Sequence, residues 1–135
     1  MNAPTDYART VGEVMTANPI SIAESASLAE AAGILDSHKI TGLPVVDDAG
    51  ALVGVLSQTD LIRVLADQHL VASWRGLPVC EVMTTPALTI EVTATLEEAA
   101  RCMEASRVHR LVVTNPAAVP IGIISTSDLA RSGSM

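Results

Sequence analysis

Apolar residues recur at intervals of three and four in two separate stretches of the chain. The positions are Leu28, Ala31, Ala32 and Leu35 in the first stretch and Leu96, Ala99, Ala100 and Met103 in the second. This spacing places them on one face of a helix. Each stretch follows a capping box, in which a hydroxyl residue precedes a glutamate by three positions: Ser27 with Glu30, and Thr95 with Glu98. The pattern predicts two helices whose apolar faces belong to the core.

Short runs of β-type residues surround each predicted helix. One run precedes it, at residues 20–22 and 88–90, and two follow it, at 43–46 with 52–56 and at 111–113 with 121–124. Asp47 to Gly50 predicts a hairpin turn, whereas residues 115–120 carry two prolines and predict a stiffer, less regular loop. A further helix is expected from Ser57 to about Ala72. Its counterpart from Ser125 is expected to span barely one turn.

The two halves of the chain are related by a displacement of 68 positions. Val14-Met15-Thr16 matches Val82-Met83-Thr84, Gly54 matches Gly122, Ser57 matches Ser125 and Asp60 matches Asp128. Such self-similarity is typical of a repeated structural unit. The chain is therefore predicted to hold two copies of a β-α-β-β-α unit.

A single copy, of about 55 residues, buries too little core to be secure alone. We therefore expect an α/β (α+β) fold in which two βαββα motifs pack as a pseudo-two-fold pair through their sheets. The expected boundaries are a flexible N-terminal tail at residues 1–10, a first motif at 11–72, a linker at 73–80 and a second motif at 81–131.

The composition narrows the classes of function. Of the 135 residues, 49% are apolar, yet there is no Phe and only one Trp and one Tyr, and the net charge is −7. Nucleic-acid binding needs clustered Lys and Arg or stacking aromatic rings, so we expect no nucleic-acid partner. No apolar run approaches the ~20 residues of a membrane span, and the N-terminus lacks a signal-peptide run. A soluble, cytoplasmic protein without a membrane partner is expected.

Residue types that serve in catalysis and metal binding are present but scattered. Cys80 and Cys102 stand far apart and are expected to be buried, reduced thiols. His38, His69 and His109 fall on different predicted elements. No phosphate-binding glycine loop, nucleophile elbow or metalloprotease motif occurs. We expect no catalytic site and no metal site, and the sequence offers no positive case for an enzyme.

The strand-to-helix junctions carry the most informative motif, Gly-h-h-Ser-x-x-Asp, where h is apolar. It places Ser57 and Asp60 at one junction and Ser125 and Asp128 at the other. Ser-x-x-Asp is a helix N-cap signature. A carboxylate there can also accept both hydroxyls of a ribose diol, and a serine beside free helix N–H groups can hold a phosphate. The motif alone leaves the structural and the ligand-binding interpretations open.

A histidine-arginine pair breaks the symmetry of the repeat. His109 and Arg110 stand where the first copy has Thr41 and Gly42. Arg offers a planar fork to phosphate oxygens and His adds a pH-dependent donor, so the pair is a candidate anion clamp. A solvated turn is the alternative. The other cations near helix ends are expected to be solvated surface charges; they are Lys39, Arg63, Arg107 and Arg131.

Three short sequences together resemble the CBS domain family, in which two βαββα motifs form one module. They are Glu-Val-Met-Thr at residues 13–16 and 81–84, Leu-Pro-Val-Val at 43–46, and the two Gly-h-h-Ser-x-x-Asp ends. The resemblance covers about residues 11–131, nearly the whole chain. Residues 104–113 and 120–129 are also similar to the last motif of the regulatory γ subunit of AMP-activated protein kinase, which binds AMP, ADP and ATP.

The resemblance implies a regulatory module that binds an adenine nucleotide in the cleft between its motifs and needs no cofactor. One site would join Ser125 and Asp128 to Asn18, Ala23, Thr41 and Gly42. The other would join Ser57 and Asp60 to Thr85, His109 and Arg110. A homodimer and an unidentified regulated protein are the implied partners. A ligand-free interaction or dimerisation module, or a binder of another adenosyl ligand such as S-adenosyl methionine, are the alternatives.

Overall fold

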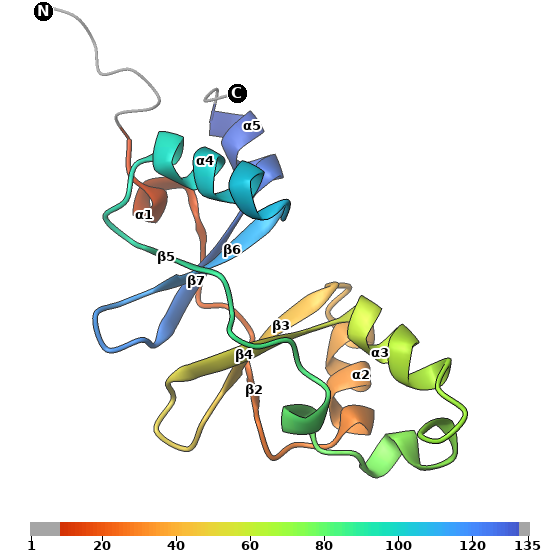
Figure 1. Ribbon diagram of the computed structural model, residues 1–135. Helices are drawn as coiled ribbons and strands as arrows, with labels where there is room; N and C mark the ends of the chain where they lie inside the picture. The colour runs from red at the N-terminus through yellow and green to blue at the C-terminus, as the bar shows by residue number, and fades with distance from the viewer. Residues whose placement is uncertain (1–8, 133–135) are drawn as a thin grey trace, which may run out of the picture. The chain divides into compact units, whose positions relative to one another are not determined.

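The computed structural model describes residues 9–132, which divide into two compact units (Figure 1). The central unit consists of residues 20–87. The terminal unit joins the described residues before position 20 to those from 88 onward. Most of the predicted tail, residues 1–8, lies outside the described part of the chain.

The central unit is built around a three-stranded sheet in the order β2-β3-β4, with β2 parallel to β3 and β3 antiparallel to β4. Its elements are β2 (Ile22–Ala23), α2 (Leu28–Ser37), β3 (Gly42–Val46), β4 (Leu52–Ser57), α3 (Gln58–Leu65) and the 3-10 helices η2 (Val71–Gly76) and η3 (Val79–Glu81). The two α-helices lie on the same side of the sheet (Figure 1). Between helices and sheet lies a core that includes Leu28, Leu43, Val45 and Leu56, all fully buried.

The terminal unit contains a four-stranded sheet in the order β1-β7-β6-β5. Its elements are α1 (Val11–Val14), β1 (Thr16–Ala17), β5 (Thr89–Glu91), α4 (Leu96–Ser106), β6 (Arg110–Thr114), β7 (Pro120–Ser125) and α5 (Thr126–Ser132). Leu96, Leu111, Val113 and Ile124 form the centre of a second core. The β-α-β-β-α order predicted from the repeat is therefore present in both units.

The opening segment of each repeat packs in the unit that contains the rest of the other repeat. Val11 and Gly12 donate backbone hydrogen bonds to the carbonyls of Ala94 and Val92, and Val11 is fully buried in the second core. In the central unit, Val79 donates to the carbonyl of Ala26 at 2.8 Å and is likewise fully buried. The compact units thus differ from the motif boundaries expected from the repeat, and the expected linker at 73–80 contributes core residues to the central unit.

Local side-chain bonds begin the helices where the sequence predicts. Thr95 and Glu98 form a complete capping box at α4, whereas at α2 the Ser27 hydroxyl accepts from the Glu30 N–H and no return bond is made. An additional capping box, not predicted, begins α1. There the backbone N–H and the hydroxyl of Thr10 both donate to the Glu13 carboxylate. These bonds lower the pKa of the Glu13 carboxyl, the backbone bond more than the hydroxyl bond.

The two C-terminal helices are nearly equal in length, which corrects the sequence prediction. α3 ends at Leu65 and not near Ala72, because the chain turns away and η2 packs against α2 and α3. α5 has seven residues and not barely one turn. The asymmetry expected between the two helices is absent from the described residues.

The two hairpin loops are alike as well, so the prediction of a less regular second loop is wrong. In the first, Asp47 Oδ1 accepts from two loop N–H groups and Gly50 has φ +86°. In the second, Asn115 Oδ1 accepts from the equivalent N–H groups and Ala118 has φ +65°. The short polar side chain at the loop start organises both turns, and the prolines do not disturb it.

The two cysteines are free, but their expected burial is wrong, since Cys80 is exposed and Cys102 half-buried. Among the described residues, no helix is both long and apolar enough to cross a membrane.

Candidate functional site

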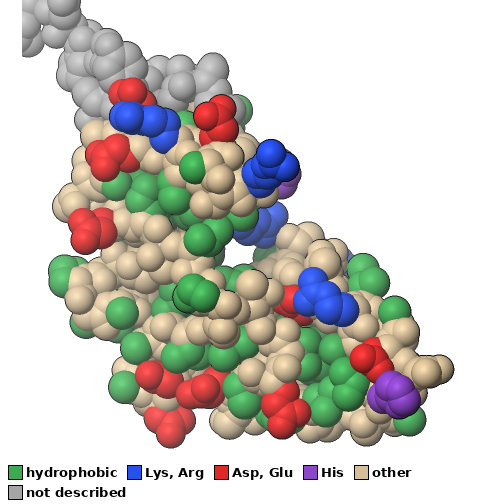
Figure 2. Space-filling model, in the orientation of Figure 1, with side chains coloured by type: hydrophobic (Ala, Val, Ile, Leu, Met, Phe, Trp, Pro, Cys, Tyr) green, Lys and Arg blue, Asp and Glu red, His purple; other side chains and the backbone are tan. Residues whose placement is uncertain are grey.

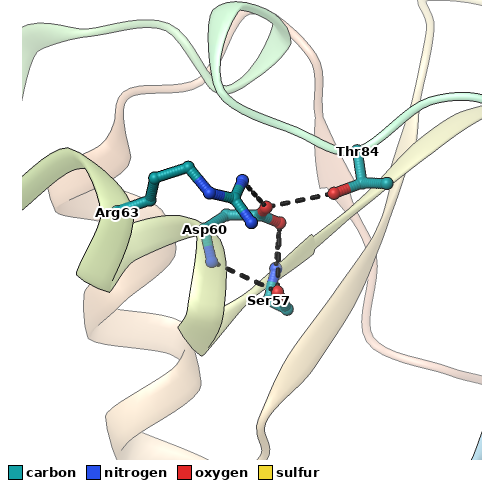
Figure 3. Close-up of polar contacts among 4 residues, drawn as sticks. All are labelled: Ser57, Asp60, Arg63 and Thr84. Carbon is teal, nitrogen blue, oxygen red and sulfur yellow. Dashed lines mark hydrogen bonds and ion pairs between the residues drawn. The ribbon is translucent and has the colours of Figure 1, made fainter. Parts of the chain in front are cut away.

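In the central unit, a buried carboxylate lies where β4 passes into α3. Ser57 caps α3, and its backbone N–H and hydroxyl donate to Asp60 Oδ2 at 2.9 and 3.1 Å. Arg63 and the Thr84 hydroxyl both donate to Asp60 Oδ1 at 3.0 Å (Figure 3). We call Ser57, Asp60, Arg63 and Thr84 the Asp60 cluster. Asp60 is only 1% exposed, and these bonds compensate its burial.

Thr84 reaches Asp60 because its segment lies against β4. Thr84 and Val55 exchange two backbone hydrogen bonds, at 3.0 and 2.9 Å. The close approach explains the glycine of the motif: a Cβ on Gly54 would lie 2.7 Å from Met83 Sδ and 2.9 Å from the Thr84 carbonyl oxygen. The motif glycine is therefore required by packing of the opening segment, whatever the ligand.

The terminal unit repeats the arrangement at the β7–α5 junction. The backbone N–H and hydroxyl of Ser125 donate to Asp128 Oδ2 at 2.8 and 3.0 Å, and Arg131 donates to Oδ1. These three residues form the Asp128 cluster. Thr16 pairs with Ile123 as Thr84 does with Val55, but no hydrogen bond joins Thr16 to Asp128 among the described residues. Asp128 is 5% exposed.

The helix-cap interpretation of Ser-x-x-Asp is thus confirmed at α3, where the reciprocal Ser57–Asp60 capping box forms, and the same reciprocal bonds link Ser125 and Asp128. The ligand-binding interpretation is not tested by these bonds. Arg63 and Arg131 are exposed, as expected of solvated surface charges, and each guanidinium also pairs with the buried carboxylate one turn before it. The 68-residue displacement also relates these arginines, which is the signal that sequence reasoning missed. Thr84 was missed because its partner lies 24 positions away.

The remaining candidate residues fall into one group in each unit. In the central unit, Gly42 lies opposite Ser57 in the β3–β4 register, and Gln58 N–H donates to the Thr41 carbonyl. Thr85 follows Thr84, and Ala23 lies on β2. All four lie on the same unit as Asp60.

In the terminal unit, Arg110 lies opposite Ser125 in the β6–β7 register, and Thr126 N–H donates to the His109 carbonyl at 2.9 Å. Asn18 donates its N–H to the Ile121 carbonyl and has φ +56°. His109, Arg110 and Asn18 thus lie on the same unit as Asp128. The combinations across the two units that the family resemblance implies stay predictions.

Two depressions mark the surface of the terminal unit. One of about 450 Å³, within the range of ligand pockets, lies between α4 and α5 and is lined by Met103, Leu129, Glu104, Arg107 and His109 among others. The other, of about 210 Å³, lies beside Asp128 and brings Arg9 and Arg131 to its rim. Arg9 is therefore a second arginine near Asp128, in addition to Arg131 of the cluster.

Comparison with known proteins gives two matches to the family model of the CBS domain, at residues 11–67 and 79–134. The chain is 32% identical over 123 residues to homoserine O-acetyltransferase of Methanocorpusculum labreanum, covering 91% of this chain and 24% of that protein. It is 30% identical to the chloroplastic CBS domain-containing protein CBSX2 of Arabidopsis thaliana, covering 91% of this chain and 63% of that one. The chain thus spans about a quarter of the length of the first protein and under two thirds of the length of the second.

Solved structures show the same fold. The structure of CBSX2 in complex with AMP matches with a TM-score of 0.81 and 34% identity, over 93% of this chain and 96% of that chain. The CBS domain pair of protein MJ0100, in complex with 5'-methylthioadenosine and S-adenosyl-L-methionine, matches with a TM-score of 0.79 and 26% identity, over 93% and 96%. Both neighbours bind a ligand that contains adenosine.

Proposed function

The chain belongs to the CBS domain family, and on that premise we propose that it is a regulatory sensor that binds an adenine nucleotide of the AMP, ADP or ATP class. The observation that carries the proposal is the pair of buried carboxylates, Asp60 and Asp128, each held by a serine at a strand-to-helix junction. A neighbour of the same fold binds AMP. A carboxylate at such a junction suits the two hydroxyls of a ribose.

The remaining candidate residues supply the other parts of a nucleotide site. His109 and Arg110 are exposed at the start of β6 and free to meet phosphate oxygens. Thr41 and Gly42 stand in the equivalent place without charge. In the proposed assignment, Asn18, Ala23, Thr41 and Gly42 serve the Asp128 site, and Thr85, His109 and Arg110 serve the Asp60 site.

Regulation would follow from population shift, because a ligand that binds one conformation better than another changes their ratio. The chain would then act on an unidentified partner protein and would carry no catalytic activity of its own. A cytoplasmic location stays a prediction.

A homodimer is part of this proposal, and the surface of α3 supports it. Ile62 is 64% exposed and Leu65 47%, and Val71 on the neighbouring η2 is 40% exposed. Figure 2 shows hydrophobic side chains at the surface in this region. Sedimentation analysis checks the idea: Ile62→Glu should convert a dimer to a monomer, whereas the same change at exposed Arg101 on α4 should not.

An alternative ligand is S-adenosyl methionine, which the MJ0100 neighbour binds. Thermal-shift measurements with AMP, ADP, ATP, S-adenosyl methionine and adenosine separate the ligands, because binding to the folded state alone raises its stability. We expect AMP or ATP to bind with a Kd between about 1 µM and 1 mM. Absence of stabilisation by every adenosyl compound would leave a ligand-free interaction module.

The assignment of the His-Arg pair has its own test. Charge-assisted contacts to phosphate are about twice as strong as neutral ones, so Arg110→Ala should remove most of the preference for AMP over adenosine. Titration calorimetry of both ligands measures that ratio. A variant that still distinguishes the two as the parent does would contradict the assignment.

A further inference from the structure

Within the central unit, every acceptor position of Asp60 is occupied. Its two oxygens accept four hydrogen bonds, from the backbone and hydroxyl of Ser57, from Arg63 and from Thr84 (Figure 3). An ionised carboxylate offers about four lone-pair sites. A ribose diol that donates both hydroxyls to Asp60 therefore has to replace donors that are already in place.

The four donors are not equally replaceable. The two from Ser57 hold the start of α3. Thr84 is held against β4 by its backbone bonds to Val55. Arg63 lies on α3 with 68% of its side chain exposed, against 2% for Asp60. Its guanidinium can return to water without disturbing any backbone bond, because the arginine end of this ion pair is exposed even though Asp60 is buried.

We propose that Arg63 determines the specificity of the Asp60 site by competing with the ligand for Oδ1. This inference rests on the proposed function. A neutral nucleoside displaces Arg63 and leaves the guanidinium without a partner. A nucleotide displaces it and offers phosphate oxygens, which Arg binds in a planar, bidentate way. The competition therefore weakens the binding of nucleosides and spares the binding of nucleotides. This effect adds to any contact that Arg110 makes with the phosphate.

Arg131 occupies the equivalent position on Asp128, with 69% of its side chain exposed. Both clusters thus carry the same exposed arginine one turn after the buried aspartate. Arg101 on α4 provides a matched control, because it pairs with Glu97 at 3.2 Å in an exposed i,i+4 bridge that touches neither cluster.

Titration calorimetry of Arg63→Gln tests the competition. Adenosine should bind this variant about two- to fivefold more tightly than it binds the parent, because the exposed guanidinium keeps the contribution of the pair in the range of surface ion pairs although Asp60 is buried. The AMP-to-adenosine ratio should fall. 2',3'-Dideoxyadenosine, which lacks the diol, should show no change. Arg101→Gln should bind both ligands as the parent does.

Ionic strength supplies a second readout. Salt screens the competing ion pair, so adenosine should bind the parent more tightly as salt is added, and this dependence should vanish in Arg63→Gln. Charge-assisted AMP binding should weaken with salt.

The outcomes separate the two proposals. A parent that binds AMP, with adenosine affinity unchanged or weaker in Arg63→Gln at an unaltered melting temperature, overturns the competition alone. A parent that binds AMP but not adenosine, with an Arg63→Gln variant that binds both, supports it. Absence of binding by both proteins overturns the proposed function and the competition together.

Discussion

The Asp60 and Asp128 clusters start from the same sequence motif, yet the structure surrounds them differently. Both aspartates accept from a capping serine and from an arginine one turn later. Only Asp60 also accepts from the threonine of the opening segment, whereas Asp128 lies beside a depression rimmed by Arg9. The repeat therefore determines the shared cap, and the neighbouring segment determines how completely each carboxylate is enclosed.

The largest difference is expected from removing the carboxylates. Asp60→Ala leaves the half-buried Ser57 N–H and the Thr84 hydroxyl without their acceptor, and a donor left unpaired away from water is costly. We expect a loss of about 3 kcal/mol in the free energy of unfolding for Asp60→Ala and about 2 kcal/mol for Asp128→Ala. Urea denaturation measures both. Equal losses would mean that the Thr84 bond adds nothing.

The second-largest difference is expected from adding a methyl group at the motif glycines, Gly54 and Gly122. At Gly54 a new methyl group meets the backbone oxygen of Thr84 at 2.9 Å, whereas at Gly122 the nearest backbone atom, Thr16 O, is 3.1 Å away. At both positions the closest atom is the sulfur of a flexible methionine side chain, Met83 or Met15, so the backbone oxygens make the difference. Overpacking costs about 1–3 kcal/mol, so Gly54→Ala should lose about 2 kcal/mol and Gly122→Ala less.

A matched control for the glycine pair lies on α2. A methyl group added at Gly33 would have no atom within 4 Å outside its own helix backbone and chain neighbours, so Gly33→Ala should gain about 0.5–1 kcal/mol from helix propensity. Urea denaturation measures this gain alongside the two losses. A loss at Gly33 comparable to that at Gly54 would contradict the steric explanation.

Deleting the threonine hydroxyls tests the asymmetry directly. Thr84→Val removes one hydrogen bond to a buried carboxylate, which should cost about 1 kcal/mol. Thr16→Val removes none that involves Asp128 and should leave the free energy of unfolding within about 0.5 kcal/mol of the parent. A Thr16→Val loss as large as that of Thr84→Val would remove the distinction between the clusters.

The hairpin loops give the smallest contrast. Ala118 adopts the left-handed conformation that Gly50 adopts in the first loop, and this conformation costs L-residues about 1 kcal/mol. Ala118→Gly should therefore gain up to about 1 kcal/mol, and Gly50→Ala should lose a similar amount. Thermal melting curves show both signs. A destabilised Ala118→Gly variant would indicate that the Ala118 side chain makes a compensating contact.

Much of each unit was predictable because it depends on contacts close in sequence. The core faces that include Leu28 and Leu96 follow from helical spacing, and the strands around Val45 and Val113 follow from their apolar runs. Helix ends were less predictable: α3 stops at Leu65 because tertiary packing of η2 interrupts it. The prediction for the second hairpin was wrong because the Asn115 side chain organises the turn and the prolines do not disturb it.

The sequence by itself determined the repeat, which is visible as self-similarity along the chain. It also determined the capping serines and the positions of the two aspartates, since each cap depends on residues within about one helical turn of one another. The tertiary structure decided that Thr84 reaches Asp60, that Gly54 has to lack a side chain, and that each opening segment packs with the other repeat. Contacts of the first kind follow from local backbone geometry. Those of the second kind depend on which segments the core brings together, and that choice is made by burial over the whole unit.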